Sequence, residues 1–180
     1  MTSIIKVNTI QDGGGNVLLT SNGSGSITTN NIGGKMTPAF SVYLSATQDI
    51  SGSSTMTRCN FNTELLDTDN AYDNSSNYRF TPQTAGKYAL FATIRGFTSS
   101  GDYNAYSIQL RKNNSAIGRS DLNMSTNALG GGANVTIPIS IVADANGSSD
   151  YFDVYFSANN ANFKAEAGTA TNFFGYKIIE

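Results

Sequence analysis

The sequence predicts an all-β protein, a sandwich or jelly roll of nine or ten strands, and three observations lead to that class. Apolar and polar residues alternate with a period of two over many short stretches, and no window shows a sustained helical stripe. Turns rich in Gly, Asn, Ser and Pro separate these stretches at the spacing typical of a sandwich. Only 13% of the 180 residues are charged, so Ser, Thr and Asn supply much of the polar surface, and these side chains disfavour helices.

Residues 1–36 differ from the rest of the chain in their sequence pattern and are predicted to form an N-terminal β-arm used for attachment. Very short apolar stretches alternate with Gly-rich turns, and such pieces are too small to build a core of their own. The arm is therefore either disordered or covers its apolar residues with the surface of a partner. The residues expected to make the attachment are Ile4, Val7, Ile10, Val17 and Leu19.

Residues 37–180 are predicted to form the main domain, because the alternation becomes regular from Pro38 onward. A long polar stretch at 67–77 is predicted to be a loop. The expected strands cover residues 40–44, 56–61, a short stretch ending at Phe80, 86–97, 103–111, 116–119, 135–141, 151–158 and 172–179.

The strand at 86–97 is the clearest of these. It follows a Pro-bearing turn, and the residues from Tyr88 to Ile94 alternate strictly between two faces. Both faces are largely apolar near Phe91, which places the strand deep in a sheet or beside a partner surface.

Two further features constrain the second half of the domain. Pro138 cannot donate a hydrogen bond to a neighbouring strand, so it indicates an edge position or a bulge. The Asn146–Gly147 pair is a strong hairpin signal and predicts that the strand at 135–141 turns back onto the strand at 151–158.

The order and spacing of the aromatic residues resemble the globular head of complement component 1q, a jelly roll of the tumour necrosis factor-like superfamily. The resemblance covers residues 38–180 and implies a ten-stranded jelly-roll sandwich that assembles as a homotrimer. The chain departs from the family pattern at one extra residue between Tyr72 and Phe80, and at Leu90 and Ala92, where the family has aromatics. The residues that carry the resemblance are Phe61, Asp67, Tyr72, Phe80, Gly86, Tyr88, Phe174, Gly175 and Tyr176.

Catalytic chemistry has little support in the sequence. The chain contains no His, which excludes Ser-His-Asp, Cys-His and His-ligated metal schemes. A glycosidase with two carboxylates remains an alternative, but no acidic pair lies in an apolar context that would raise a pKa. We therefore expect a protein that is not an enzyme and that carries no cofactor, calcium apart.

Calcium binding is one of two interpretations of the acidic segment around residue 70. Asp67, Asp69 and Asp73 offer the oxygen ligands that calcium prefers, although the segment lacks the pattern of an EF-hand. The alternative is that these side chains cap their own turns, as Asp does in many polar loops.

Partners are also constrained by composition. A net charge of −2 without a basic run disfavours nucleic acid, and no apolar stretch is long enough for membrane insertion. Cys59 is the sole cysteine, so no intrachain disulfide forms, and it is expected to be a small buried residue. Tyr43, Tyr103, Tyr151 and Tyr155 form either a surface for a host glycan or protein, or part of the trimer interface.

The leading segment VNTIQDGGGNVLLTSNG resembles the short N-terminal modules of some bacteriophage structural proteins. Together with the low charge and the missing catalytic groups, it indicates a virion structural protein made in the host cytoplasm and carried on the virion surface. The first expectation is a capsid decoration knob or short head fibre anchored to virion proteins by the arm. The alternative is a segment or tip of a tail fibre that binds a host surface receptor. A secreted cellular module is disfavoured because no signal peptide is visible.

Overall fold

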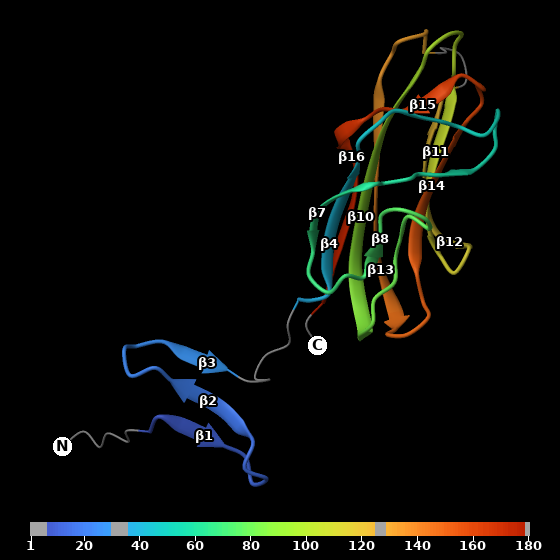
Figure 1. The fold of residues 1–180 in the computed structure, drawn as a ribbon. Helices are drawn as coiled ribbons and strands as arrows, with labels where there is room; N and C mark the ends of the chain where they lie inside the picture. Colours follow the sequence, from blue (N-terminus) through green and yellow to red (C-terminus); the bar gives the residue numbers. More distant parts are fainter. Residues whose placement is uncertain (1–6, 30–35, 125–128, 179–180) are drawn as a thin grey trace. The chain divides into compact units, whose positions relative to one another are not determined.

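The computed structural model describes residues 7–29, 36–124 and 129–178, and these residues form only strands, turns and loops (Figure 1). The all-β prediction is confirmed. The chain divides into two compact units, with the boundary between Lys35 and Met36.

The first unit contains a three-stranded antiparallel sheet with the strand order β1-β2-β3. Its strands are β1 (Thr9–Gln11), β2 (Val17–Ser21) and β3 (Ile27–Thr29). The first turn is closed by the Asp12 carboxylate, which accepts hydrogen bonds from the backbone N–H groups of Gly14 and Asn16 at 2.8 and 2.9 Å. These side chain to backbone bonds shape the turn without any apolar core.

The second unit is a sandwich of two antiparallel sheets. The larger, named here the β10 sheet, has the order β5 (Gln48–Asp49), β15 (Phe163–Ala165), β10 (Ala85–Thr98), β16 (Gly168–Lys177), β4 (Ala39–Leu44) and β7 (Thr63–Asp67), with β13 (Val135–Asn146) paired along β10. The smaller, named the β14 sheet, has the order β12 (Ser115–Asn123), β11 (Ala105–Lys112), β14 (Phe152–Ala158), β9 (Arg79–Phe80) and β8 (Tyr72–Asp73), with β6 (Thr57–Arg58) beside β14.

The core between the sheets is built from inward-facing residues of the alternating strands. Along β10, Tyr88, Leu90 and Ile94 are fully buried, which confirms the period-two reading of this strand. Aromatic rings fill much of the space, and Phe40 stacks on Phe80 with ring centroids 4.2 Å apart. The largest fully buried side chains are Tyr88, Tyr103, Tyr106, Phe40, Phe61, Phe80, Phe152, Phe156, Phe163, Phe173, Leu90 and Ile94.

Two glycines of the family pattern sit where a side chain would not fit. Gly86 begins β10 with a φ of 144°, a backbone conformation that L residues rarely adopt. A Cβ on Gly175 would lie 2.7 Å from the Leu90 side chain and 2.8 Å from the Ala89 carbonyl oxygen. Both positions therefore require glycine for the close approach of β10 and β16.

Several predicted boundaries need correction. The strand expected at 56–61 is reduced to Thr57–Arg58, and the one at 116–119 extends over Ser115–Asn123 as half of a hairpin. The expected loop at 67–77 contains a short strand, Tyr72–Asp73, because the buried Tyr72 ring anchors it to the core. Short pieces of this kind bring the strand count of the described domain above the predicted ten.

The predicted hairpin at Asn146–Gly147 is wrong. The strand before it, β13, pairs with β10, whereas the strand after it, β14, pairs with β11 in the opposite sheet. The segment is a tight turn, but it connects the two layers. The edge position predicted from Pro138 is confirmed, since β13 pairs only with β10 among the described residues.

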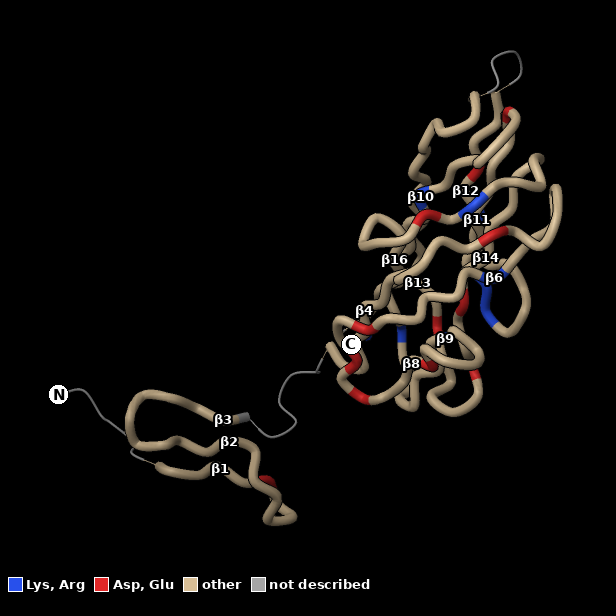
Figure 2. The backbone as a smooth tube through the Cα atoms, turned by 45° about the horizontal axis from the view of Figure 1, so that its top comes forward, with Lys and Arg blue, Asp and Glu red and all other residues tan. Residues whose placement is uncertain are grey.

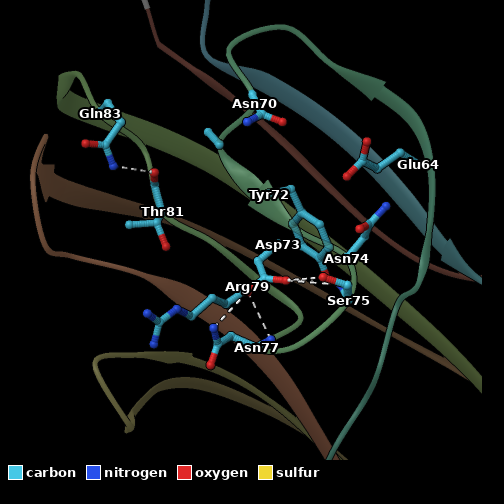
Figure 3. A pocket seen from close by; sticks show the side chains of 11 residues that line it. Glu64, Asn70, Tyr72, Asp73, Asn74, Ser75, Asn77, Arg79, Thr81 and Gln83 are labelled. Atoms are coloured by element: carbon cyan, nitrogen blue, oxygen red, sulfur yellow. Dashed lines mark hydrogen bonds between the residues drawn. The ribbon is translucent and has the colours of Figure 1, made fainter.

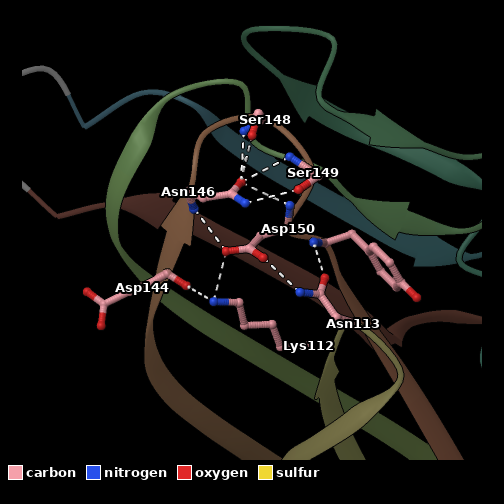
Figure 4. A network of polar contacts seen from close by, with 8 residues as sticks. Lys112, Asn113, Asp144, Asn146, Ser148, Ser149 and Asp150 are labelled. Carbon is pink, nitrogen blue, oxygen red and sulfur yellow. Dashed lines mark hydrogen bonds and ion pairs between the residues drawn. The ribbon is translucent and has the colours of Figure 1, made fainter.

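A polar network holds this connection in place (Figure 4). The Asn146 side-chain oxygen accepts hydrogen bonds from the backbone N–H groups of Ser148, Ser149 and Asp150. The Asp150 carboxylate, almost fully buried, forms an ion pair with Lys112 at 2.9 Å and accepts a hydrogen bond from Asn113 at 2.7 Å. The network links the turn between the layers to the tip of the β11–β12 hairpin.

Candidate binding surfaces

A surface hollow of about 570 Å³ lies beside the polar segment after β7 (Figure 3). Its lining is almost entirely polar. Glu64 and Asn74 lie on one side of the Tyr72 ring, and Arg79 and Gln83 lie on the other. Such a lining suits a hydrated polar ligand better than an apolar one.

Four side chains in this hollow keep their hydrogen-bonding groups free. Within the described parts of the chain, no side-chain hydrogen bond or ion pair engages Glu64, Asn70, Asn74 or Arg79. Partial burial, with a contribution from the nearby Asp67, raises the pKa of Glu64. The hollow thus presents both donors and acceptors, as a site for a polar ligand does.

The three acidic residues proposed for calcium do not form a common site. The Asp67 carboxylate accepts hydrogen bonds from the backbone N–H groups of Ala71 and Tyr72 at 3.0 and 2.8 Å. Asp73 closes its own turn through the N–H groups of residues 75–77, and these bonds hold its pKa well below the usual range. The Asp69 carboxylate accepts a hydrogen bond from the neighbouring Thr68 hydroxyl, and the Asp69 backbone N–H donates to Asp67. No group of three or more His, Cys, Asp or Glu side chains in the described residues is placed to hold a metal ion, so the turn-capping interpretation fits the geometry.

An apolar surface covers the outer face of the β10 sheet. The rings of Phe91 and Phe174 stack with centroids 5.0 Å apart, and Tyr176 lies 6.2 Å from Phe91. Phe174 is 38% exposed and Val142 61% exposed. A hollow of about 310 Å³ lies beside these residues and is lined in part by Pro138 and Ile139. Both faces of β10 are apolar near Phe91, as predicted, but the described residues cover only one of them.

The predicted tyrosine surface is partly wrong. Tyr103 is 1% exposed and donates a hydrogen bond to the Ala133 carbonyl, so it belongs to the core. Tyr43, Tyr151 and Tyr155 are half-buried, the last two on the outer face of the β14 sheet. Cys59 is fully buried, as expected, and burial raises the pKa of its thiol.

The arm sheet has two different faces. Thr9, Thr20 and Thr28 are paired across the three strands and share one face. The opposite face carries apolar side chains around a small hollow of about 110 Å³, lined by Val7, Asn8, Thr9, Ile10, Leu19, Ser21 and Ile27. Of the predicted attachment residues, Val7 and Ile10 are exposed, Val17 and Leu19 are half-buried, and Ile4 lies outside the described residues.

Four charged residues that the sequence does not reveal as a group meet on the outer face of the β14 sheet: Arg58, Arg79, Arg111 and Asp153. A signal was present at Asp153, which interrupts a strand between the buried Phe152 and Val154. A carboxylate inside so apolar a strand is unusual and marks a position of interest.

The two-layer topology and the aromatic core define the domain as a jelly roll, a fold that it shares with solved structures of Eiger TNF and murine APRIL. Among solved structures, Eiger TNF from S. frugiperda aligns with a TM-score of 0.60 at 9% identity, over 78% of this chain and 91% of that one. Murine APRIL aligns with a TM-score of 0.56 at 12% identity, over 78% and 98%. The globular domain of zebrafish complement 1qA aligns at 0.49 and 15% identity, over 78% and 96%.

No protein-family model and no curated protein matches the sequence. The likeness therefore concerns the fold alone. Among the described residues no helix has the length and hydropathy needed to cross a membrane.

Proposed function

We propose that this chain is a non-enzymatic bacteriophage virion structural protein, a homotrimeric capsid decoration knob or short head fibre. Residues 1–36 attach it to virion proteins, and the jelly roll projects from the virion surface. The observation that carries the proposal is the open apolar face of the arm sheet. Val7 is 53% exposed, Ile10 43% and Ile27 66%, although the sheet has few residues with which to stabilise itself.

A sheet of three such short strands is marginal in water unless its apolar face is covered. Covering that face on a shell protein stabilises the arm and anchors the domain in one step. The free edges at β1 and β3 also allow a strand of the shell to be added to the sheet.

The trimer follows from the jelly-roll resemblance and is supported by the outer face of the β10 sheet. Phe91, Phe174, Tyr176 and Val142 give that face a cluster of apolar groups with no cover inside the described chain. Packing against the neighbouring subunits of a trimer removes this surface from water.

The second candidate is a tail-fibre segment or tip that binds a host surface receptor. It is favoured by the polar hollow of about 570 Å³, whose unpaired side chains suit a hydrated ligand. The two candidates differ in where the protein sits on the particle, so labelling the protein on intact virions for electron microscopy separates them.

The test of the attachment role is deletion of residues 1–36. We expect the truncated protein to remain a folded trimer but to be absent from purified particles. Light scattering should then give three times the mass of one truncated chain, which is 19.1 kDa minus the mass of the arm. A matched pair of full-length variants sharpens the result. Ile10→Ser with Ile27→Ser removes the apolar face, whereas Thr20→Ser with Thr28→Ser changes only the opposite face, because neither threonine lines the hollow.

Only the isoleucine pair is expected to lower occupancy on the particle. Normal occupancy of the truncated protein would show that attachment runs through the jelly roll. Dissociation of the truncated protein into monomers would show that the arm belongs to the trimer itself.

A further inference from the structure

The outer face of the β14 sheet gathers three arginines around one aspartate. In the register of β11 and β14, Arg111 lies directly opposite Asp153. On the other side of β14, Phe80 pairs with Phe152, which brings Arg79 beside Asp153. Arg58 pairs with Tyr155, two residues further along the strand. Four strands from distant parts of the chain therefore build this cluster.

Asp153 is buried without a partner for its charge. It is 2% exposed, its Oδ1 accepts no hydrogen bond, and no arginine nitrogen in the described residues lies within ion-pair distance of it. Burial raises its pKa to about 6 and outweighs the opposite effect of Arg58, Arg111 and Arg79. An unpaired carboxylate at this depth costs the fold stability, so its presence calls for a role outside folding.

The arginines stack on tyrosine rings instead of pairing with the aspartate. The Arg111 guanidinium lies 3.9 Å from the centroid of Tyr155, and that of Arg79 lies 4.2 Å from the centroid of Tyr151. Arg58 lies over Tyr78 at 5.6 Å, and its Nε is buried without a partner. Stacking leaves the N–H groups in the plane of the guanidinium accessible to a ligand, and those of Arg79 have no partner among the described residues. Arg111 uses one edge, since its Nε and Nη2 donate to the Gln109 side-chain oxygen at 3.0 and 2.9 Å, and keeps its other N–H groups for a ligand.

Other contacts hold the stack of Arg79 on Tyr151 in place. The Tyr151 backbone N–H donates to the Asn113 side chain at 3.0 Å, which ties it to the network around Asp150 (Figure 4). The Arg79 side chain makes no hydrogen bond within the described residues, and it also lines the polar hollow beside Tyr72 (Figure 3). The cluster and the hollow are therefore adjacent and share Arg79.

The chemistry of this surface selects an anionic sugar. Three arginines against one aspartate leave a local excess of positive charge in a chain of net charge −2 whose charged residues are sparse (Figure 2). Paired guanidinium N–H groups match the geometry of a carboxylate or sulfate. A simple anion has no use for the free side chains of Glu64, Asn70 and Asn74 in the adjoining hollow, whereas a sugar supplies hydroxyl groups that hydrogen-bond to them.

We propose that the outer face of the β14 sheet is a binding site for a sugar that carries a carboxylate or sulfate. Arg79 and Arg111 hold the acidic group, and stacking on Tyr151 and Tyr155 keeps the two guanidinium groups in place. Asp153 lies buried between them and does not contact the sugar. Further sugar units extend into the hollow lined by Glu64, Asn70 and Asn74. This site goes beyond the proposed attachment role and does not depend on it.

The test is isothermal titration of the full-length protein at low ionic strength with three oligosaccharides of equal length: tetragalacturonate, a sulfated galactan fragment, and neutral maltotetraose. We expect one or both acidic probes to bind and the neutral one not to. Which acidic probe binds identifies the anionic group. Raising the salt concentration is expected to weaken the interaction.

The variants Arg79→Ala and Arg111→Ala are expected to weaken binding roughly tenfold or more, because each loses a charge-assisted hydrogen-bond pair. Arg119→Ala is the matched control. Arg119 lies on the same sheet, pairs with the exposed Asp121 and stacks on no tyrosine. Arg79→Lys keeps the charge without the fork and is expected to bind less tightly than the wild type.

Absence of binding by both acidic probes to the wild-type protein would overturn the proposal, whatever the variants do. Equal binding of maltotetraose, or an equal loss of affinity in Arg119→Ala, would also overturn it. Because the experiment uses protein in solution, its failure leaves the attachment of the arm to the particle untouched.

Discussion

Replacing Asp153 with asparagine is expected to stabilise the protein at neutral pH. The substitution keeps the shape of the side chain but removes a charge that is 2% exposed and has one oxygen without a hydrogen bond. A pKa raised from 3.8 to about 6 corresponds to about 3 kcal/mol of unfavourable free energy when the group is ionised, at about 1.4 kcal/mol per pKa unit. The substitution also removes the attraction between the carboxylate and the arginine side chains around it. We therefore expect the free energy of unfolding to rise by only about 1–2 kcal/mol.

The effect has a definite pH window. Because the folded-state pKa lies above the unfolded value, the protonated carboxyl contributes stability that is complete below pH 3.8 and is lost as the pH rises through about 6. The difference between Asp153→Asn and the wild type is therefore expected to be largest at pH 8 and to shrink toward zero at pH 4.

Thermal unfolding followed by circular dichroism at pH 4 and pH 8 measures the difference. A gain of this size corresponds to a rise in Tm of about 3–6 °C at pH 8 for a domain of this length. Asp144→Asn is the control, because the Asp144 side chain is exposed. The hydrogen bond that Lys112 donates to Asp144 goes to its backbone carbonyl, which the substitution retains. A destabilised Asp153→Asn variant at pH 8, or an equal shift at both pH values, would refute the reasoning.

Three further outcomes follow from the structure. Tyr88→Ala is expected to lower the free energy of unfolding, measured in urea, by about 3–5 kcal/mol, because it empties a fully buried site. Tyr88→Phe loses only the 2.6 Å hydrogen bond to the Thr84 carbonyl and is expected to lower it by about 1 kcal/mol. Equal losses in the two variants would contradict the placement of Tyr88 in the core. Asp150→Ala is expected to lower the Tm at pH 7, because it breaks the ion pair with Lys112 and the hydrogen bond from Asn113. These contacts lower the pKa of Asp150, so the stability they contribute is present above the unfolded-state pKa and is lost as the pH falls, and a Tm difference that stays constant down to pH 2 would contradict this role. Chelation by EDTA is expected to leave the Tm unchanged, since Asp67 and Asp73 bond to their own turns, and a fall in Tm on chelation would restore the calcium interpretation.

The parts of the fold that local sequence controls were predictable. The alternation in β10 identified Tyr88 and Ile94 as core residues, and Pro138 indicated an edge strand. The signals are strong because the side-chain period of a strand is two, and because proline lacks a donor.

The parts that depend on pairing between distant strands were not predictable. The residues at Asn146–Gly147 encode a turn, but nothing local determines whether the chain then pairs with itself or crosses to the other layer. The same limit applies to the cluster around Asp153, since Arg58, Arg79 and Arg111 approach it only through the register of four strands. Tyr103 looked exposed because its burial depends on the ring of Phe163, sixty residues away, at a centroid distance of 5.0 Å.

Pro138 has a consequence for how copies of the domain behave at close quarters. It lies near the middle of β13, whose outer edge is unpaired among the described residues. A second strand approaching that edge would find a gap in the row of donors, and exposed edges of this length otherwise promote runaway sheet growth between molecules. Pro138 therefore disfavours polymers in which copies of the domain join edge to edge. Copies at high local concentration are left to associate through the side-chain faces of the sandwich.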